Sequence, residues 1–410
     1  MNVTALVCTH CGAAHPLDAR LSCDTCLGPL EPAYDYAKVR RLMTRERIEA
    51  GPRTLWRYVD LLPVAAPAPN ALPVGFSPLV NAPRLAEALG LRELHLKIEA
   101  ANPTHSFKDR VVSVASAKAL ELGLEALACA STGNLAGAVA AQAAALGLEA
   151  YIFIPADLER EKIIAASVPG AHIFAVEGNY DDANRLCAEL AYERPWAFVN
   201  FNVRPYYGQG SKTVAFETAE QLGWRLPGQT IAPIASGSLY TKIDRGFREL
   251  LEVGLVEGDV PDAYGAQAEG CSPVATAFRL GAEQVEPVRP DTIAKSLAIG
   301  SPADGANALK VARRAGGRIE SVTDDEIVEA IGLLARTTGY FTETAGGVTI
   351  ATLAKLARAG QIDPDRSTVA YLTGDGLKTP DAAAEFVAPY QIEADIDAVD
   401  AVLARVLDRV

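Results

Sequence analysis

The stretch Asn102-Pro103-Thr104-His105-Ser106-Phe107-Lys108-Asp109-Arg110 marks the junction between an expected turn and an expected helix. An Asn-Pro step disfavours helix and favours a turn, and Ser106 followed by Asp109 has the spacing of a capping box. The residues from Phe107 to Leu122 have a helical apolar period, and Gly123 ends the helix. The stretch therefore predicts a turn that delivers Lys108 to the first turn of a helix.

Lys108 is the chemically informative residue of this stretch. The positive end of a helix dipole disfavours an ammonium group and favours the free amine. A lysine held as a free amine is a candidate for imine formation with a carbonyl compound. On spacing alone, a solvated first-turn lysine without such a role is the alternative.

Strand and helix signals alternate outward from this stretch. The apolar segments 94–98, 126–130, 150–154, 231–235 and 368–373 predict buried strands, and helical segments lie between most of them. Such alternation is typical of βαβ units in parallel sheets that are covered on both faces. We therefore expect an α/β fold with doubly wound parallel sheets, in which ligands bind beyond the carboxyl ends of the strands.

Polar loops follow three of these expected strands. In Ser131-Thr132-Gly133-Asn134, backbone N–H groups suit a carboxylate and the Asn amide suits a phenolic oxygen, although an ordinary helix cap is the alternative. Ser236-Gly237-Ser238-Leu239-Tyr240-Thr241 suits a phosphate and is not the GxGxxG dinucleotide motif. Thr373 offers a hydroxyl to a heterocycle nitrogen or belongs to a plain turn. Glu343 precedes small residues that leave room for a ligand or for close helix packing.

Four of the seven cysteines lie in the first 26 residues, as Cys8-x-x-Cys11 and Cys23-x-x-Cys26. Two such pairs fit one tetrahedral thiolate site, with zinc favoured over iron. A disulfide framework would need an oxidising compartment, and a redox-active pair is a further alternative. We expect a small structural zinc ribbon in which these four cysteines are the ligands.

The composition limits the classes of partner. The net charge of −13 over 410 residues argues against nucleic acid or an acidic membrane as the main partner. Polar residues interrupt the apolar stretch 126–155, so it does not read as a membrane span. The start of the sequence shows no leader pattern. We therefore expect a cytoplasmic, enzyme-like protein.

Taken together, these motifs resemble the pyridoxal-phosphate enzymes of fold type II, the tryptophan-synthase-β-like superfamily, and within it the threonine synthases. The resemblance covers nearly all of residues 76–385, and an amino-terminal ribbon occurs in some members. The segments that carry it are Asn102–Arg110, Ala130–Asn134, Val176–Ala183, Lys212–Glu217, Gln267–Cys271, Ile299–Ala303 and Leu372–Lys378.

The resemblance implies a role for each matching residue. Lys108 would carry the cofactor imine and act as acid and base at the substrate's α and β carbons, and Ser131 and Thr132 would hold the substrate carboxylate. Asn134 would bond the cofactor ring oxygen, and Thr373 would face the ring nitrogen. The residues that would cradle the cofactor phosphate are Ser236, Gly237, Ser238, Leu239 and Thr241.

The reaction implied is the conversion of O-phospho-L-homoserine and water to L-threonine and phosphate, by a homodimer. The sequence departs from the family where Arg204-Pro205-Tyr206-Tyr207 replaces Asn-Pro-aromatic-Arg, and His105 replaces a usual Gly. This puts the contact to the substrate phosphate in doubt. The candidates for that contact are Arg110, Arg204, Lys212 and Lys242.

Two other functions stay open on sequence alone. One is a related β-elimination or replacement enzyme, such as a threonine/serine dehydratase or another amino-acid synthase. The other is a binding or regulatory protein on an inactive enzyme scaffold.

The sequence also predicts five segments. They are a zinc ribbon at 1–35, an extended arm at 36–75 that includes a helical segment at Lys38–Glu49, an N-terminal α/β domain with Lys108 at 76–205, a C-terminal α/β domain with the phosphate loop at 206–385, and a helical tail at 386–410.

Overall fold

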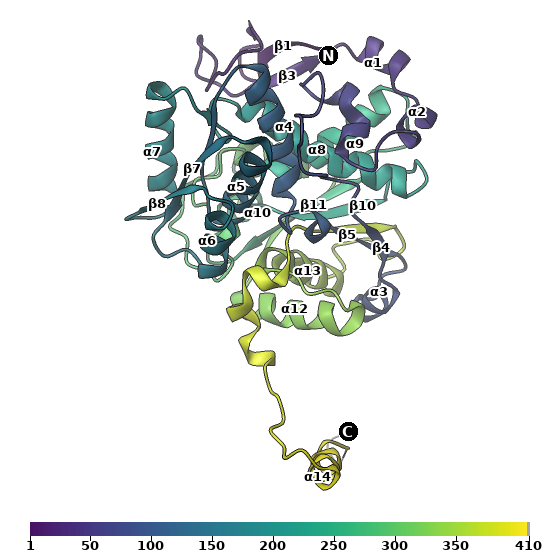
Figure 1. Ribbon diagram of the computed structural model, residues 1–410. Helices are drawn as coiled ribbons and strands as arrows, with labels where there is room; N and C mark the ends of the chain where they lie inside the picture. The colour runs from purple at the N-terminus through teal and green to yellow at the C-terminus, as the bar shows by residue number, and fades with distance from the viewer. Residues whose placement is uncertain (408–410) are drawn as a thin grey trace.

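The computed structural model describes residues 1–407 and contains two mainly parallel sheets and a small antiparallel ribbon (Figure 1). The larger sheet has the order β12-β11-β10-β13-β5-β4, and only β4 runs antiparallel to its neighbour. Its strands are β4 (Leu79–Asn81), β5 (Leu94–Ile98), β10 (Gln229–Pro233), β11 (Asp262–Ala268), β12 (Ile319–Val322) and β13 (Thr368–Leu372).

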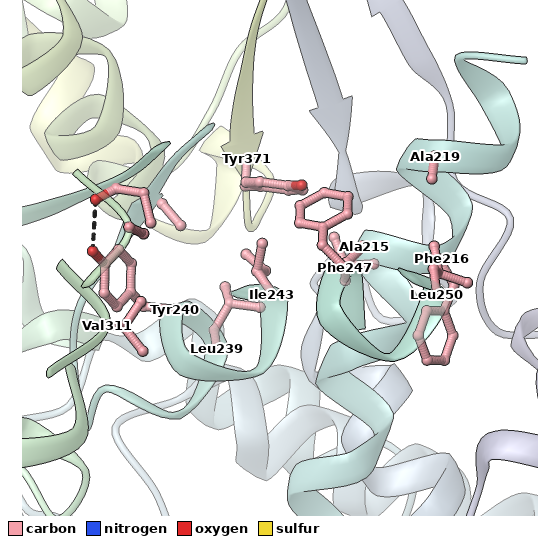
Figure 2. Close-up of a cluster of buried hydrophobic side chains, with 14 of the residues drawn as sticks. Ala215, Phe216, Ala219, Leu239, Tyr240, Ile243, Phe247, Leu250, Val311 and Tyr371 are labelled. Carbon is pink, nitrogen blue, oxygen red and sulfur yellow. Dashed lines mark hydrogen bonds between the residues drawn. The ribbon is translucent and has the colours of Figure 1, made fainter. Parts of the chain in front are cut away.

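Helices cover both faces of this larger sheet. Alternate residues of a strand point to opposite faces, so neighbouring strand residues pack in different apolar clusters. Ala232 and Tyr371 belong to one buried apolar cluster, whereas their neighbours Ile231 and Ala370 belong to another. The first cluster packs strand residues against α8 and α9, as Figure 2 shows for Tyr371, Ile243 and other side chains. The covering helices are α3 (Pro83–Leu89), α9 (Ser238–Glu252), α10 (Pro273–Arg279), α11 (Gly305–Arg314), α12 (Asp324–Thr338) and α13 (Thr344–Arg358).

The smaller sheet has the order β8-β7-β6-β9, with all its strands parallel. Its strands are β6 (Ala126–Ala130), β7 (Glu149–Pro155), β8 (His172–Val176) and β9 (Ala197–Phe198). The associated helices are α4 (Lys108–Glu121), α5 (Asn134–Leu146), α6 (Arg160–Ser167), α7 (Tyr180–Glu193) and α8 (Arg204–Gln221). Helix α8 packs on both α4 and α9 and so joins this part of the chain to the larger sheet.

The order of strands differs from the order of the chain. Strand β5 was expected in the domain at 76–205, but it pairs with β13 of the larger sheet. A cut at residue 205 therefore does not separate the two sheets. Local sequence shows that 94–98 is a strand, but it carries no information about which distant strand lies beside it.

The amino-terminal ribbon is a sheet of three antiparallel strands, in the order β2-β1-β3. The strands are β1 (Val3–Cys8), β2 (Ala14–His15) and β3 (Leu30–Tyr34). Leu6 and Leu30 share a buried cluster with Val111 and Val112 of α4. The ribbon therefore rests on the main body, above α4, α8 and α9 in Figure 1.

The arm after the ribbon is more structured than expected. The helical segment predicted at 38–49 is interrupted, and Thr44 caps the second part by accepting a hydrogen bond from Arg47 N. The arm contains α1 (Tyr36–Leu42), α2 (Arg45–Glu49) and the 3-10 segment η1 (Leu55–Leu61). Its apolar side chains pack on Val114 and Ala117 of α4.

The end of the chain leaves the main body. The segment η5 (Pro380–Phe386) leads through an extended stretch to α14 (Ile396–Leu407), which lies away from the body in Figure 1. The expected tail at 386–410 thus includes one helix, and its residues 408–410 lie outside the described part. Among residues 1–407, none of the helices combines the length and the apolar character needed to cross a membrane.

Candidate active site

A cleft opens at the carboxyl ends of β6, β10 and β13, where α4, α5, α9 and α13 begin. It encloses about 760 Å³ not filled by protein atoms, part of it open to solvent. Most of the predicted site residues line this cleft: Lys108, Ser131, Thr132, Asn134, Ser236, Gly237, Ser238, Leu239 and Thr373. The larger and smaller sheets thus contribute their loops to a single cleft.

The turn before Lys108 is held against the end of β13. Phe107 N donates to Thr373 O over 3.0 Å, and Ser106 forms a bridge with Gly374. The expected capping box is absent because Asp109 accepts instead from Thr104 N and Oγ1, each over 2.7 Å. The turn that precedes Lys108 is therefore fixed by tertiary contacts rather than by a helix cap.

The amine of Lys108 lies in the cleft and has a low pKa. Enclosure by protein lowers the pKa of Lys108 to about 8, against the opposing effect of the Glu343 carboxylate. Loss of hydration disfavours the charged form of an amine. The sequence predicts a favoured free amine from the helix dipole, whereas burial is the main cause in the structure.

The loop after β6 combines a cap with a tight turn. Ser131 Oγ accepts hydrogen bonds from Gly133 N and Ala136 N, each over 2.9 Å. Gly133 has a φ of +122°, which an L residue rarely adopts. Asn134 donates from Nδ2 to both Glu343 oxygens, over 2.8 and 2.9 Å, and its Oδ1 is buried without a partner. The amide oxygen therefore keeps the capacity to accept a hydrogen bond from a ligand.

The loop after β10 leads into the N-terminus of α9. Thr241 N donates to Gly237 O over 3.1 Å, so the preceding N–H groups have no partner within the helix. Gly237 has a φ of +94°, and a Cβ there would lie 2.9 Å from Asp304 O. This tight turn at a positive helix end has the features of a phosphate cradle. Thr241 does not line the cleft, and its hydroxyl bonds Gly237 O and Ser238 O.

Arg110 lies behind the cleft and not in it. Its guanidinium is fully buried and bonds Glu99 and Glu217, while Lys97 Nζ also lies 2.9 Å from Glu217. Arg110 was expected as a contact for the substrate phosphate, and this cluster leaves it no such role. Two cations and two carboxylates balance there, and they tie β5 and α4 to α8.

The other three basic residues that were candidates for the substrate phosphate contact lie at different places relative to the cleft. Lys212 is buried and pairs with Glu249 over 2.7 Å, and Lys242 pairs with Glu31 of the ribbon. Burial lowers the pKa of Lys212 to about 7 against the effect of Glu249. Arg204 is partly exposed at the start of α8 and pairs with Asp304, over 2.8 Å, next to the phosphate loop. Arg204 does not line the cleft itself, but it lines a smaller pocket beside Ser238 together with Lys242, and its side chain is the more exposed of the two.

The structure adds Tyr180, Tyr207 and Glu343 to the lining of the cleft. Tyr207 Oη lies 3.3 Å from Lys108 Nζ. In the sequence, only the small residues that follow Glu343 pointed to that side chain. Tyr207 was indicated only by the departure of residues 204–207 from the family pattern Asn-Pro-aromatic-Arg. A single sequence does not show that either residue reaches Lys108.

A second cluster of possible ligands lies in the ribbon, where the four Sγ atoms of Cys8, Cys11, Cys23 and Cys26 all lie within 4.8 Å of one another. None of the four forms a disulfide, and backbone N–H groups donate to Cys8 Sγ and Cys23 Sγ. Four sulfur ligands at this separation fit a tetrahedral zinc ion. His15 Nε2 lies 3.3 Å from Cys23 Sγ, but His15 is not one of the four residues of the cluster.

Comparison with known proteins gives consistent results. Residues 71–374 match the family model described as "Pyridoxal-phosphate dependent enzyme". The chain is 38% identical to a threonine synthase of Methanocaldococcus jannaschii, covering 97% of this chain and 98% of that protein. It is 36% identical to a threonine synthase of Methanosarcina acetivorans, covering 96% and 97%.

A solved structure supports the fold over nearly the whole chain. The processed form of threonine deaminase isoform 2 from Solanum lycopersicum has a TM-score of 0.62, with 20% identity over 94% of this chain and 97% of that one. At this identity, the likeness establishes the fold and not the activity.

Proposed function

The chain belongs to the threonine synthase family of pyridoxal-phosphate dependent enzymes, and from this premise we propose that it converts O-phospho-L-homoserine and water to L-threonine and phosphate. The observation that carries the proposal is the convergence of Lys108, the loop at Asn134 and the phosphate-type loop at Gly237 on one cleft. A carbonyl-bearing, phosphorylated cofactor needs these three elements together.

The residues present fit pyridoxal phosphate. Lys108 supplies a low-pKa amine, Asn134 Oδ1 is buried without a partner, and the turn at Gly237 leaves no room for a Cβ. When bound, the cofactor supplies the electron sink that stabilises negative charge on substrate carbons. We propose that Asn134 and Thr373 contact its ring, and that residues 236–239 hold its phosphate, with Thr241 supporting the loop from behind.

The remaining chemistry falls to the protein's own side chains. We propose that Lys108 removes and returns protons at the α and β carbons, which its pKa near neutrality suits. Thr132 and the backbone of its loop would hold the substrate carboxylate, and the Ser131 hydroxyl proton is available to it because Ser131 Oγ only accepts in this loop. Arg204, which pairs with Asp304 beside the phosphate loop, is the cation that we propose contacts the substrate phosphate.

The ribbon completes the proposal. We propose that Cys8, Cys11, Cys23 and Cys26 hold a structural Zn²⁺, because four thiolates close its coordination shell and leave no open position for catalysis. A homodimer and a cytoplasmic location stay proposals that rest on the resemblance and on the acidic composition.

The central test is Lys108→Ala. We expect loss of threonine formation from phosphohomoserine, and loss of covalent cofactor attachment on borohydride reduction, with an unchanged far-ultraviolet circular dichroism spectrum. Lys310→Ala, at an exposed position of α11, is the matched control and should retain both properties.

Serine and threonine serve as competing substrates in the same assay. If the wild-type protein releases keto acid and ammonia from them faster than it forms threonine, it is a dehydratase. If the Lys108→Ala variant keeps its activity, Lys108 is not the residue that binds the cofactor. If the wild-type protein binds no cofactor and gives no product, the scaffold is a binding protein.

A further inference from the structure

We propose that Tyr207 is a positioning residue for Lys108, whose hydroxyl holds the Lys108 amine whenever that amine is not covalently linked. The inference rests on the proposed function, because an amine that removes and returns protons alternates between protonated and unprotonated forms. Its direct basis is the 3.3 Å distance between Lys108 Nζ and Tyr207 Oη. Among the described residues, this is the one hydrogen-bond partner that the structure gives to Lys108 Nζ.

The position of Tyr207 is fixed by α8. This helix packs on α4, which carries Lys108, and on α9, which follows the phosphate loop. Tyr207 is 8% exposed, so its ring is held by its neighbours, and the residue lines the cleft. Lys108 Nζ lies 6.0 Å from the Tyr207 ring centre, so the contact is made by the hydroxyl rather than by the ring face.

The hydroxyl is neutral at the pH where the enzyme would work. Burial raises the pKa of Tyr207 above its usual value, and Arg204 opposes this effect only in part. A neutral phenol can accept a hydrogen bond from an ammonium group and can donate one to an amine. Tyr207 therefore suits a partner that must hold Lys108 in both of its protonation states.

The other groups around Lys108 do not stabilise both of its protonation states. The Glu343 carboxylate raises the pKa of Lys108 and so favours the charged form. A carboxylate only accepts hydrogen bonds, so it stabilises the ammonium form alone. Among residues 1–407, Tyr207 is the one hydrogen-bond partner of Lys108 Nζ, and its hydroxyl can serve the free amine as well.

The test compares Tyr207→Phe with Tyr206→Phe. Tyr206 is the adjacent residue of α8, is also buried, and donates to Asp18 O over 2.9 Å in the ribbon, away from the cleft. Each variant loses one hydroxyl and one hydrogen bond, so general damage to α8 should appear in both. Only Tyr207→Phe removes the contact with Lys108.

The first measurement uses the cofactor-free protein. Lys108 is labelled by formaldehyde and cyanoborohydride over a series of pH values, and its extent of labelling is read by mass spectrometry of the peptide. In Tyr207→Phe the midpoint should fall by about half a pH unit or more, because the hydrogen bond that the hydroxyl accepts from the ammonium form is stronger than the one it donates to the free amine, so its loss destabilises the ammonium form more. The midpoint in Tyr206→Phe should match that of the wild type.

The second measurement uses the cofactor-loaded enzyme. For Tyr207→Phe we expect kcat to fall about tenfold to a hundredfold, with less than a threefold change in KM, as for a lost hydrogen bond to a charged group. An unchanged labelling midpoint, or a kcat within threefold of wild type, would overturn the proposal. If the wild type forms no threonine, the proposed function fails, and the labelling alone decides the contact between Tyr207 and Lys108.

Discussion

Replacing Glu217 with Gln should destabilise the fold strongly, because the buried cluster behind Lys108 is balanced in charge. Glu217 is fully buried and accepts from Arg110 Nη1 and Nη2 over 2.6 and 2.7 Å, and from Lys97 Nζ over 2.9 Å. It also accepts from the backbone N–H groups of Phe76 and Ser77, over 2.6 and 3.2 Å. Gln keeps the shape of the side chain and removes its charge.

The expected magnitude follows from the charges that remain. Arg110 and Lys97 would share the single carboxylate of Glu99, which leaves one uncompensated buried positive charge. Removing one partner of a buried ion pair costs about 3–5 kcal/mol. This corresponds to a decrease of roughly 6–20 °C in the unfolding temperature, at about 2–4 °C per kcal/mol. The free energy of unfolding of a typical domain is only about 5–15 kcal/mol.

Two comparison variants separate charge balance from general damage. Glu189→Gln removes an exposed carboxylate that pairs with Arg185 over 2.9 Å, and it should change the free energy of unfolding by less than about 0.5 kcal/mol. The double variant Lys97→Met with Glu217→Gln removes one charge of each sign. It should be more stable than Glu217→Gln alone, since Arg110 keeps Glu99 as its partner.

The assay is urea and thermal unfolding followed by far-ultraviolet circular dichroism. Burial alone would raise the pKa of Glu217, but Arg110 and Lys97 outweigh it and lower the pKa to about 2. Because the folded-state value lies below the unfolded value of about 4.3, this stabilisation is present at neutral pH. It is lost as the pH falls from about 4.3 toward 2. The difference between wild type and Glu217→Gln should therefore shrink in acid.

Two results would refute the explanation that Glu217→Gln loses stability because a buried positive charge is left uncompensated. A loss below about 1 kcal/mol in Glu217→Gln would show that the buried charges are compensated by other means. A double variant no more stable than the single one would show that the cost lies in lost hydrogen bonds and not in the unpaired cation.

Two further predictions concern the cofactor and the ribbon. Gly237→Ala should weaken cofactor binding about tenfold or more in a fluorescence titration, since its φ is +94° and a Cβ would meet Asp304. Gly254→Ala, at the other end of α9 with a φ of +75° and open space for a Cβ, should leave that affinity unchanged, and equal affinities in the two variants would count against the cradle. Cys23→Ser should lower metal content and the unfolding temperature while kcat changes less than threefold. Cys187→Ala, outside the ribbon, should keep its metal, and a metal-free Cys23→Ser protein as stable as wild type would exclude a structural role.

Part of the fold could be predicted from local patterns alone. The apolar segments at 126–130 and 231–235 became β6 and β10, and the polar loops that follow them became the cleft. These predictions hold because strand and helix periods depend on neighbouring residues, and because parallel strands present their carboxyl ends at one edge.

Which charged side chains reach the cleft could not be predicted in the same way. Arg110 follows Lys108 by only two residues, yet two residues in a helix turn the side-chain direction by about 200°. Lys108 thus meets the cleft while Arg110 points to Glu99 and Glu217. On α8, Tyr207 and Ser211 share the face that lines the cleft, and the next residue, Lys212, turns away to Glu249.

The α/β class, the cysteine cluster and the loops proposed to hold a phosphorylated cofactor could be inferred from the sequence, because each depends on residues that lie close together in the chain. Tertiary packing set three further features: β5 joins the larger sheet, Tyr207 contacts Lys108 while Glu343 contacts Asn134, and Arg110 is buried among carboxylates. The physical reason is that these outcomes depend on the packing of helices and strands distant in the chain, and no local period encodes which faces will meet.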